Sequence, residues 1–186
     1  MAQSDRWPPI YSADDLLDQI TGLVQDKSIF KNFYEPDLVD PAKCQGDIVE
    51  IDSEALYLDG DLTPVTSDER YSHWLIIGNT CDIYRDLEKA KWSQIVPVYK
   101  IGTSQELSAK KLEEFQSYGG SRIFYLPAWD STVQNYHFLA DFLRPVTIYK
   151  AGLLKTKTVG RLNKISWILL HSCLIRFLAR DDGRYD

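Results

Sequence analysis

The segment from Leu162 to Ala179 constrains the fold most strongly, because its apolar residues cover more than one side of a helix. A helix of this kind is buried on most of its sides or shares its surface with a partner. Lys164, His171 and Arg176 interrupt the apolar run, so the pattern does not favour a membrane span. We expect this helix to pack against its own domain, or to contact a protein partner or a second copy of the chain.

The remainder of the chain predicts short strands with added helices, which is an α+β pattern that is mainly β. An N-terminal helix begins at Ser12, and an irregular connection follows from Lys27 to Cys44. A second exposed helix spans Ser104 to Ser117. The predicted strands are rich in branched and aromatic residues, and they are Gly46–Ile51, Ala55–Leu58, Trp74–Gly78, Gln94–Ile101, Arg122–Leu126, Tyr136–Phe142 and Pro145–Tyr149. Pro97 indicates that its strand lies at an edge or carries a bulge.

A strand-to-helix junction holds the residues most suited to chemistry. The strand ending at Gly78 leads into Asn79, Thr80, Cys81 and Asp82, which open a short helix that extends to about Lys91. A thiol at a helix N-terminus can have a lowered pKa, which makes Cys81 a possible nucleophile or ligand. Alternatively, Thr80 or Asp82 caps the helix and Cys81 is a small buried hydrophobic residue. Any site here should lie where the junction meets the acidic loop from Asp61 to Arg70.

The three cysteines and three histidines of the chain do not predict a disulfide framework, a metal site or a cofactor. Cys44, Cys81 and Cys173 are far apart and form no C-x-x-C pair, which favours a reducing cytoplasm. The N-terminus lacks the pattern of a secretion signal. If a metal binds, the first choice is Cys81 and Asp82 with one histidine, and the next is His137 beside Asp141.

Charge is unevenly distributed along this chain of net charge −6. Residues 35–69 contain eleven acids and one base, whereas residues 144–164 contain six bases and no acid. The basic segment could meet a phosphate backbone, but pairing with the acidic half of the same protein, or with a second subunit, is favoured. The candidate binding residues are Asn79 and Cys81 at the junction, and Arg144, Lys150, Lys155, Lys157 and Arg161 in the basic segment.

Three segments in order carry a family resemblance: Gln45–Ile51 with its Gly-Asp-Ile-Val, His73–Gly78, and Gln94–Val98 with its Val-Pro-Val. Their order resembles the MazF/PemK-like proteins over residues 45 to about 101. The resemblance implies a small SH3-like barrel over residues 45–150. Residues 1–44 then form an N-terminal helix and connection, and residues 151–186 a basic loop and a long C-terminal helix packed on the same domain. Thr80–Ile83 and Arg161-Leu162 also resemble a bacterial group to which we assign no activity.

The resemblance further implies toxin-like endoribonuclease activity, but the toxin residues are replaced in this chain. Those enzymes place Arg-Pro at the entry of the strand that corresponds to Trp74–Gly78, where Ser72-His73 stands here, and Tyr99 replaces a threonine. RNA cleavage needs a proton acceptor and a cation near the phosphate. The remaining catalytic candidates are Arg70, His73, Thr80 and Asp82. The sequence therefore favours a non-catalytic interaction or accessory module of a bacterial toxin–antitoxin or defence-type system, with an endoribonuclease acting on RNA as the alternative.

Overall fold

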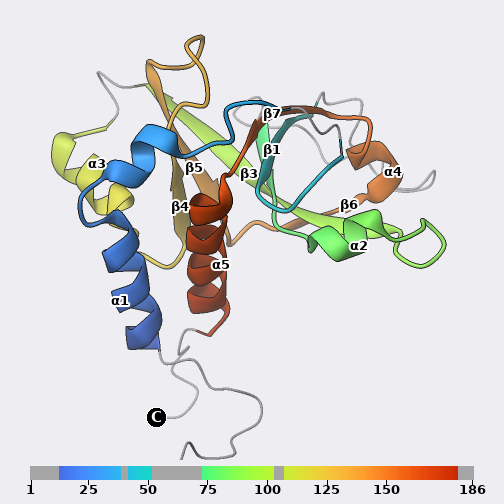
Figure 1. Ribbon diagram of the computed structural model, residues 1–186, viewed down its shortest axis with the longest axis horizontal. Helices are drawn as coiled ribbons and strands as arrows, with labels where there is room; N and C mark the ends of the chain where they lie inside the picture. Colours follow the sequence, from blue (N-terminus) through green and yellow to red (C-terminus); the bar gives the residue numbers. More distant parts are fainter. Residues whose placement is uncertain (1–12, 39–41, 52–72, 103–106, 180–186) are drawn as a thin grey trace, which may run out of the picture.

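The computed structural model describes residues 13–38, 42–51, 73–102 and 107–179, and it has an α+β architecture (Figure 1). The helices are α1 (Ala13–Val24), the 3-10 helix η1 (Ser28–Asn32), α2 (Thr80–Tyr84), α3 (Ala109–Gln116), α4 (Lys150–Leu153) and α5 (Lys164–Leu178). The strands are β1 (Asp47–Glu50), β2 (His73–Ile76), β3 (Trp92–Gly102), β4 (Ile123–Leu126), β5 (Tyr136–Asp141), β6 (Val146–Tyr149) and β7 (Lys157–Arg161). The mixed class is therefore confirmed.

The seven strands form one antiparallel sheet in the order β4-β5-β3-β2-β1-β7, with β6 also paired to β3. Because β3 is long, one side of it pairs first with β6 and then with β5, while its other side pairs with β2. Among the described strands no pairing joins β4 to β7, so the sheet is open. The closed barrel that the resemblance implies is not confirmed.

Pro97 lies in the central strand, so the prediction of an edge or bulged strand is wrong. On one side of β3 it is opposite Trp74 of β2. On the other side, β6 pairs up to Ile95 and β5 pairs from Val98, so Pro97 falls between the two partners. A residue without an N–H is tolerated where the ladder is interrupted.

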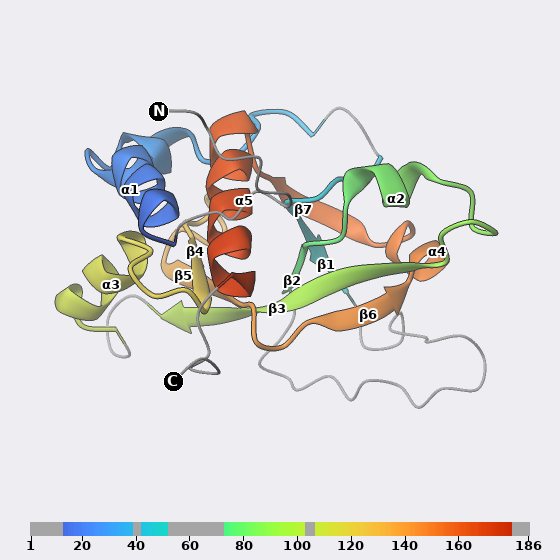
Figure 2. The ribbon, with the colours of Figure 1, turned by 90° about the horizontal axis from the view of Figure 1, so that it is seen from below.

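Two apolar clusters lie on the sheet. The larger one joins the sheet to α1 and α5, through residues such as Ile20 and Leu169, and the smaller one joins it to α2 and α4, through Ile83 and Leu153. Figure 2 shows α5 lying across the sheet, with α1 on one side of it and α2 on the other. No helix of the described residues has the length and apolarity needed to cross a membrane.

Several predicted elements have different bounds in the structure. The helix after the junction ends at Tyr84 instead of about Lys91, because the backbone of Arg85 is extended. The buried Lys150 Nζ donates to the carbonyl oxygens of Asp82 and Arg85 at this end. Within the irregular connection, η1 is regular. The second helix begins at Ala109 with Ser108 as its cap. Ser12, Ser104 and the predicted strand Ala55–Leu58 lie outside the described residues.

The predicted basic loop instead contains α4 and β7. Polar and apolar residues alternate only weakly along β7, but β7 pairs with the outer side of β1. Asp47 is fully buried and receives hydrogen bonds from Arg161 Nε at 2.7 Å and Nη2 at 2.9 Å, while the Lys157 Nζ lies 3.8 Å from Glu50. The strand is therefore joined to a distant segment by its backbone pairing and by the buried Arg161–Asp47 pair.

Candidate functional site

The structure separates the predicted catalytic residues. His73 begins β2 opposite Glu50 at the end of β1, whereas Thr80 opens α2 and contacts Gln45 just before β1. Since a strand rises about 3.3 Å per residue, the four residues of β1 alone separate the two positions by roughly 10 Å. Asp82 lies with Thr80 on α2, and Arg70 lies outside the described residues. His73 is therefore not brought together with Thr80 and Asp82.

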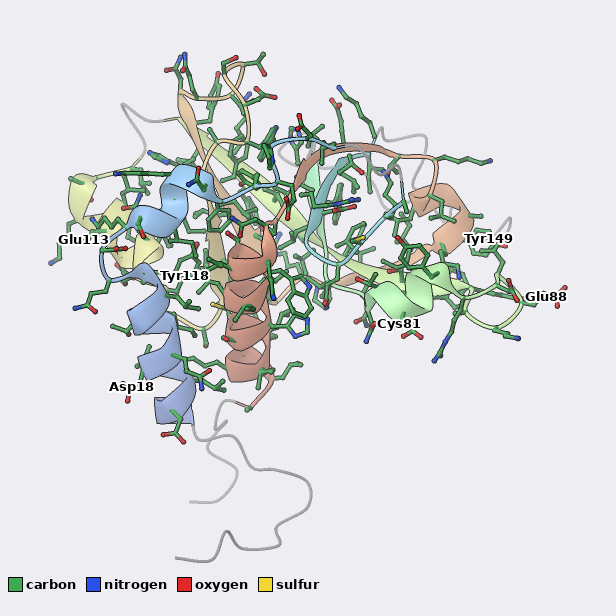
Figure 3. The ribbon with its side chains drawn as sticks, in the orientation of Figure 1. Asp18, Cys81, Glu88, Glu113, Tyr118 and Tyr149 are labelled. Carbon is green, nitrogen blue, oxygen red and sulfur yellow. The ribbon has the colours of Figure 1, made fainter. Side chains whose placement is uncertain are left out.

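Residues at the junction after β2 fix its backbone. Asn79 Oδ1 accepts the Cys81 N–H at 2.8 Å, so Asn79 is the cap and neither Thr80 nor Asp82 takes that role. Thr80 Oγ1 accepts the N–H of Gln45 at 3.0 Å, and Asp82 Oδ1 lies 2.9 Å from Arg85 Nη1. Cys81 is exposed on the outside of α2 (Figure 3), so the prediction of a buried cysteine is wrong.

The predicted basic binding residues do not form one stripe. Lys150 is buried beneath α2, and Arg161 is held by Asp47. Lys157 pairs with Glu50, and Arg144 Nε lies 3.9 Å from Asp141 Oδ2, while Lys155 is exposed after α4. The contacts with Asp47 and Glu50 are the intramolecular pairing that the charge pattern favours over phosphate binding.

The metal candidates are also dispersed. His137 is the second residue of β5 and Asp141 is its last, about 13 Å apart. His137 Nδ1 lies 3.0 Å from the Tyr125 hydroxyl, and Asp141 accepts hydrogen bonds from Arg122. Within the described residues no group of three or more His, Cys, Asp or Glu side chains could hold a metal ion.

His73 lies in an aromatic rim, defined here as His73, Lys100, Trp129 and Tyr136. The His73 ring centroid is 4.9 Å from that of Trp129, and Lys100 Nζ lies 3.8 Å from the ring centroid of Tyr136. Burial lowers the pKa of His73, with nearby Lys100 adding to this effect and Glu50 opposing it. The rim is a surface of tilted, closely packed rings with a cation beside it.

A second polar cluster connects the junction to α5. Gln45 Nε2 donates to the Ile77 carbonyl oxygen at 2.7 Å, which leaves Gln45 Oε1 to accept from His171 Nε2 at 2.5 Å. The His171 ring also packs on Trp167, with centroids 4.1 Å apart. Burial lowers the pKa of His171, which favours its neutral form. Gln45 thus ties Thr80, the end of β2 and α5 together.

Beside this cluster is a cavity of about 340 Å³, which we call the α5 cavity. Gln45, Gln94 and His171 form its polar wall. Its apolar wall comes from α5, the β5–β6 connection and the end of β2, and consists of Ile77, Phe142, Pro145, Leu174, Ile175, Phe177 and Leu178. The volume lies at the lower end of the range for ligand pockets and suits one bulky side chain or a small molecule.

The outward side of α5 is apolar as well, and we call it the α5 face. It consists of Trp167, Ile168 and Leu178, whose exposed fractions are 37%, 40% and 77%. Ile165 lies on another side of the helix, where it lines a hollow with residues of α1 and η1. Among the described residues the members of the α5 face are three of the ten exposed large hydrophobic side chains. The opposite side of the helix, with Leu169 and Leu170, is fully buried in the core. The domain thus buries only one side of the apolar surface of α5 and leaves the other side exposed.

Sequence reasoning identified the helix but not the α5 cavity or the bond from Gln45 to His171. The only signal was a histidine within an apolar helix, and nothing in the sequence relates it to a glutamine so distant. Comparisons with protein-family models, curated proteins and solved structures gave no match. The geometry of these surfaces therefore carries the functional argument.

Proposed function

We propose that this protein is a non-catalytic interaction module that holds a protein partner on the α5 face. The observation that carries the proposal is the row of exposed apolar side chains on α5 beside the α5 cavity. We further propose that it serves as an accessory component of a bacterial toxin–antitoxin or defence-type system in the cytoplasm. Its three free cysteines suit a reducing compartment.

Physical chemistry supports the α5 face as a binding surface. Covering a large apolar side chain with a partner contributes about 1.5–3 kcal/mol when burial is complete. Trp167 is the residue type that most often dominates such contacts, and a cavity next to it can receive a side chain of the partner. The α5 face therefore has the composition of an interface core with an aromatic anchor.

The separation of His73 from Thr80 and Asp82 supports the module over the endoribonuclease. A proton acceptor and a charge-stabilising group have to reach the same phosphate, which side chains at opposite ends of β1 do not do. A relation to the MazF/PemK-like proteins, including an SH3-like barrel, remains part of the proposal. Its support is that the strand with Gly46-Asp-Ile-Val pairs with β2, and β2 with the Val-Pro-Val strand.

Site-specific photo-crosslinking tests the module directly. A benzoylphenylalanine at Ile168, in cells that produce the protein, should give a covalent protein adduct. The matched control is Leu154 at the end of α4, which is 45% exposed against 40% for Ile168. Leu154 should give no adduct, and the absence of an adduct at both positions would contradict the proposal.

RNA contact at the aromatic rim is a second candidate, favoured by the Lys100–Tyr136 contact and the packing of His73 on Trp129. Aromatic rings and cations together bind single-stranded nucleic acid with little sequence preference. In fluorescence anisotropy with a labelled single-stranded RNA, Lys100→Glu should weaken binding about tenfold. Lys110→Glu on α3 is the matched control, and equal affinities for the two variants would exclude the rim as the RNA site.

A further inference from the structure

We propose that the α5 cavity binds a neutral aromatic small molecule that carries one N–H or O–H donor, of which indole and phenol are the simplest examples. The inference goes beyond the proposed function, because it assigns a ligand to the α5 cavity whether or not a partner covers the α5 face. The ligand and a side chain of a partner cannot occupy the cavity together. The inference follows from the charge, the hydrogen-bonding groups and the shape of the cavity wall.

The wall of the α5 cavity is uncharged. None of the described residues that line it is an acid, a lysine or an arginine, and its polar groups are two amides and an imidazole. Arg176 lies on the same helix, but its side chain donates to the carbonyl oxygens of Tyr118 at 2.9 Å and Gly119 at 2.7 Å. A charged ligand would lose hydration here without gaining a counter-charge, which disfavours phosphates, amino acids and metal ions.

His171 gives the polar wall a hydrogen-bond acceptor. The carbonyl oxygen of Ile77 can only accept, so the Gln45 atom that faces it at 2.7 Å is Nε2, and Gln45 Oε1 faces His171 Nε2. His171 Nε2 therefore carries the proton. Burial lowers the pKa of His171, so the ring is neutral at neutral pH and its other nitrogen, Nδ1, is unprotonated. No described residue donates to Nδ1, which leaves this acceptor for a donor on the ligand.

Gln94 adds a second polar group at the rim of the cavity. Its backbone carbonyl oxygen accepts from the N–H groups of Ile77 at 3.0 Å and Gly78 at 2.9 Å, which fixes the residue beside the cavity. Its side chain is exposed, and among the described residues no group forms a hydrogen bond with it. An exposed amide can turn to donate or to accept, so the demand for a donor on the ligand comes from His171.

Two aromatic rings make the apolar wall suited to a flat ligand. The rings of Phe142 and Phe177 both line the cavity, with centroids 5.7 Å apart and planes inclined by 56°. Aromatic rings attract one another in offset or edge-to-face contacts, so a third ring gains more here than an aliphatic group of equal size. The volume of about 340 Å³ lies at the lower end of the range for ligand pockets, which suits a molecule of one or two fused rings.

Titration of the purified, isotope-labelled chain with indole, followed by two-dimensional NMR, tests the inference. The backbone amide signals of Ile77, Gln94 and Phe177 should shift and saturate, with a dissociation constant on the order of 100 μM for a ligand of this size. Signals around Ile165, which lines the separate hollow beside α1, should stay unchanged. The absence of saturable shifts up to about 5 mM indole, or shifts centred on Ile165, would overturn the inference.

A matched pair of ligands tests the hydrogen bond without any substitution in the protein. N-methylindole keeps the ring system and lacks the N–H donor, so it should bind the wild type about fivefold more weakly than indole. His171→Phe keeps a ring at this position and removes the acceptor, so this variant should bind the two ligands with equal affinity. Equal affinities of the wild type for the two ligands would overturn the assignment of a donor-bearing ligand.

A cavity-filling substitution locates the ligand. Ile175 lines the α5 cavity and is partly exposed, so Ile175→Trp should fill the cavity and weaken indole binding at least ~10-fold. Ile165→Trp makes the same change on the same helix at the hollow beside α1, and it should leave the affinity for indole unchanged. Equal effects of the two substitutions would overturn the placement of the ligand in the α5 cavity.

Discussion

Helices α2 and α5 border the same part of the molecule but use their side chains in opposite ways. The polar residues that open α2 are committed within the chain: Asn79 caps the helix, Thr80 accepts from Gln45 and Asp82 pairs with Arg85. The α5 face presents apolar side chains that no described residue covers. Residue types suited to chemistry thus serve the fold here, and the surface available for binding is the apolar one.

The largest expected effect comes from breaking the anchor of the segment that carries Gln45. Asp47 is fully buried and receives two hydrogen bonds from Arg161. Asp47→Asn should lower the free energy of unfolding by about 3–5 kcal/mol, because it leaves the guanidinium without its counter-charge. Urea denaturation measures this. Glu50→Gln, at the exposed pair with Lys157, is the control and should change stability by less than about 1 kcal/mol.

A smaller effect is expected where Lys150 holds the end of α2. Its buried Nζ donates to the carbonyl oxygens of Asp82 and Arg85. Lys150→Met keeps the length of the side chain and should cost about 2 kcal/mol, because the two carbonyl groups lose their charged donor. Thermal unfolding of this variant is compared with that of Lys155→Met, whose side chain is exposed and which should change stability by less than ~0.5 kcal/mol.

A substitution on the α5 face should leave folding stability unchanged and reduce binding, in contrast to the substitutions at Asp47 and Lys150. Leu178 is 77% exposed, so Leu178→Glu should change the free energy of unfolding of the monomer by less than ~0.5 kcal/mol. The same variant should lose the protein adduct that forms from Ile168 in photo-crosslinking. A large loss of monomer stability would mean that Leu178 serves the core, and would remove the contrast between the two helices.

The smallest effect concerns His171, where the two helices are linked through Gln45. Burial lowers its pKa in the folded protein below the unfolded value of about 6.5, so the unfolded chain binds the proton more readily at low pH. The stability that His171 contributes is therefore complete above pH 6.5 and is lost as the pH falls towards its folded pKa. His171→Gln should make unfolding in urea less dependent on pH between 5 and 7. An unchanged dependence of stability on pH would contradict this contribution of His171.

Local patterns predicted most elements of this fold, whereas contacts between distant segments were not predicted. The helix over residues 162–179 and the three strands between Arg122 and Tyr149 follow from hydrophobic spacing and turn residues, which are local. Strand β7 was missed because it is held by backbone pairing with β1 and by the bond of Arg161 to Asp47, which both involve a distant segment. The central place of Pro97 was missed because it depends on where β5 and β6 meet along β3.

In the candidate site, too, features set by local sequence were predictable and features formed by distant segments were not. The junction residues are close in sequence, so a cap near Asn79–Asp82 was predictable, although not which residue provides it. The apolar excess of the C-terminal helix predicted a shared surface. The α5 cavity was not predictable, since its walls come from five separate segments that meet only in the folded chain.

Photo-crosslinking at Ile168, with Leu154 as the matched position, tests most directly whether the α5 face is a binding surface. The two side chains have nearly equal exposure but lie on different helices. We predict a protein adduct from Ile168 and none from Leu154. No adduct from Ile168, or adducts of equal yield from both positions, would contradict the assignment of the α5 face as the interaction surface of this protein.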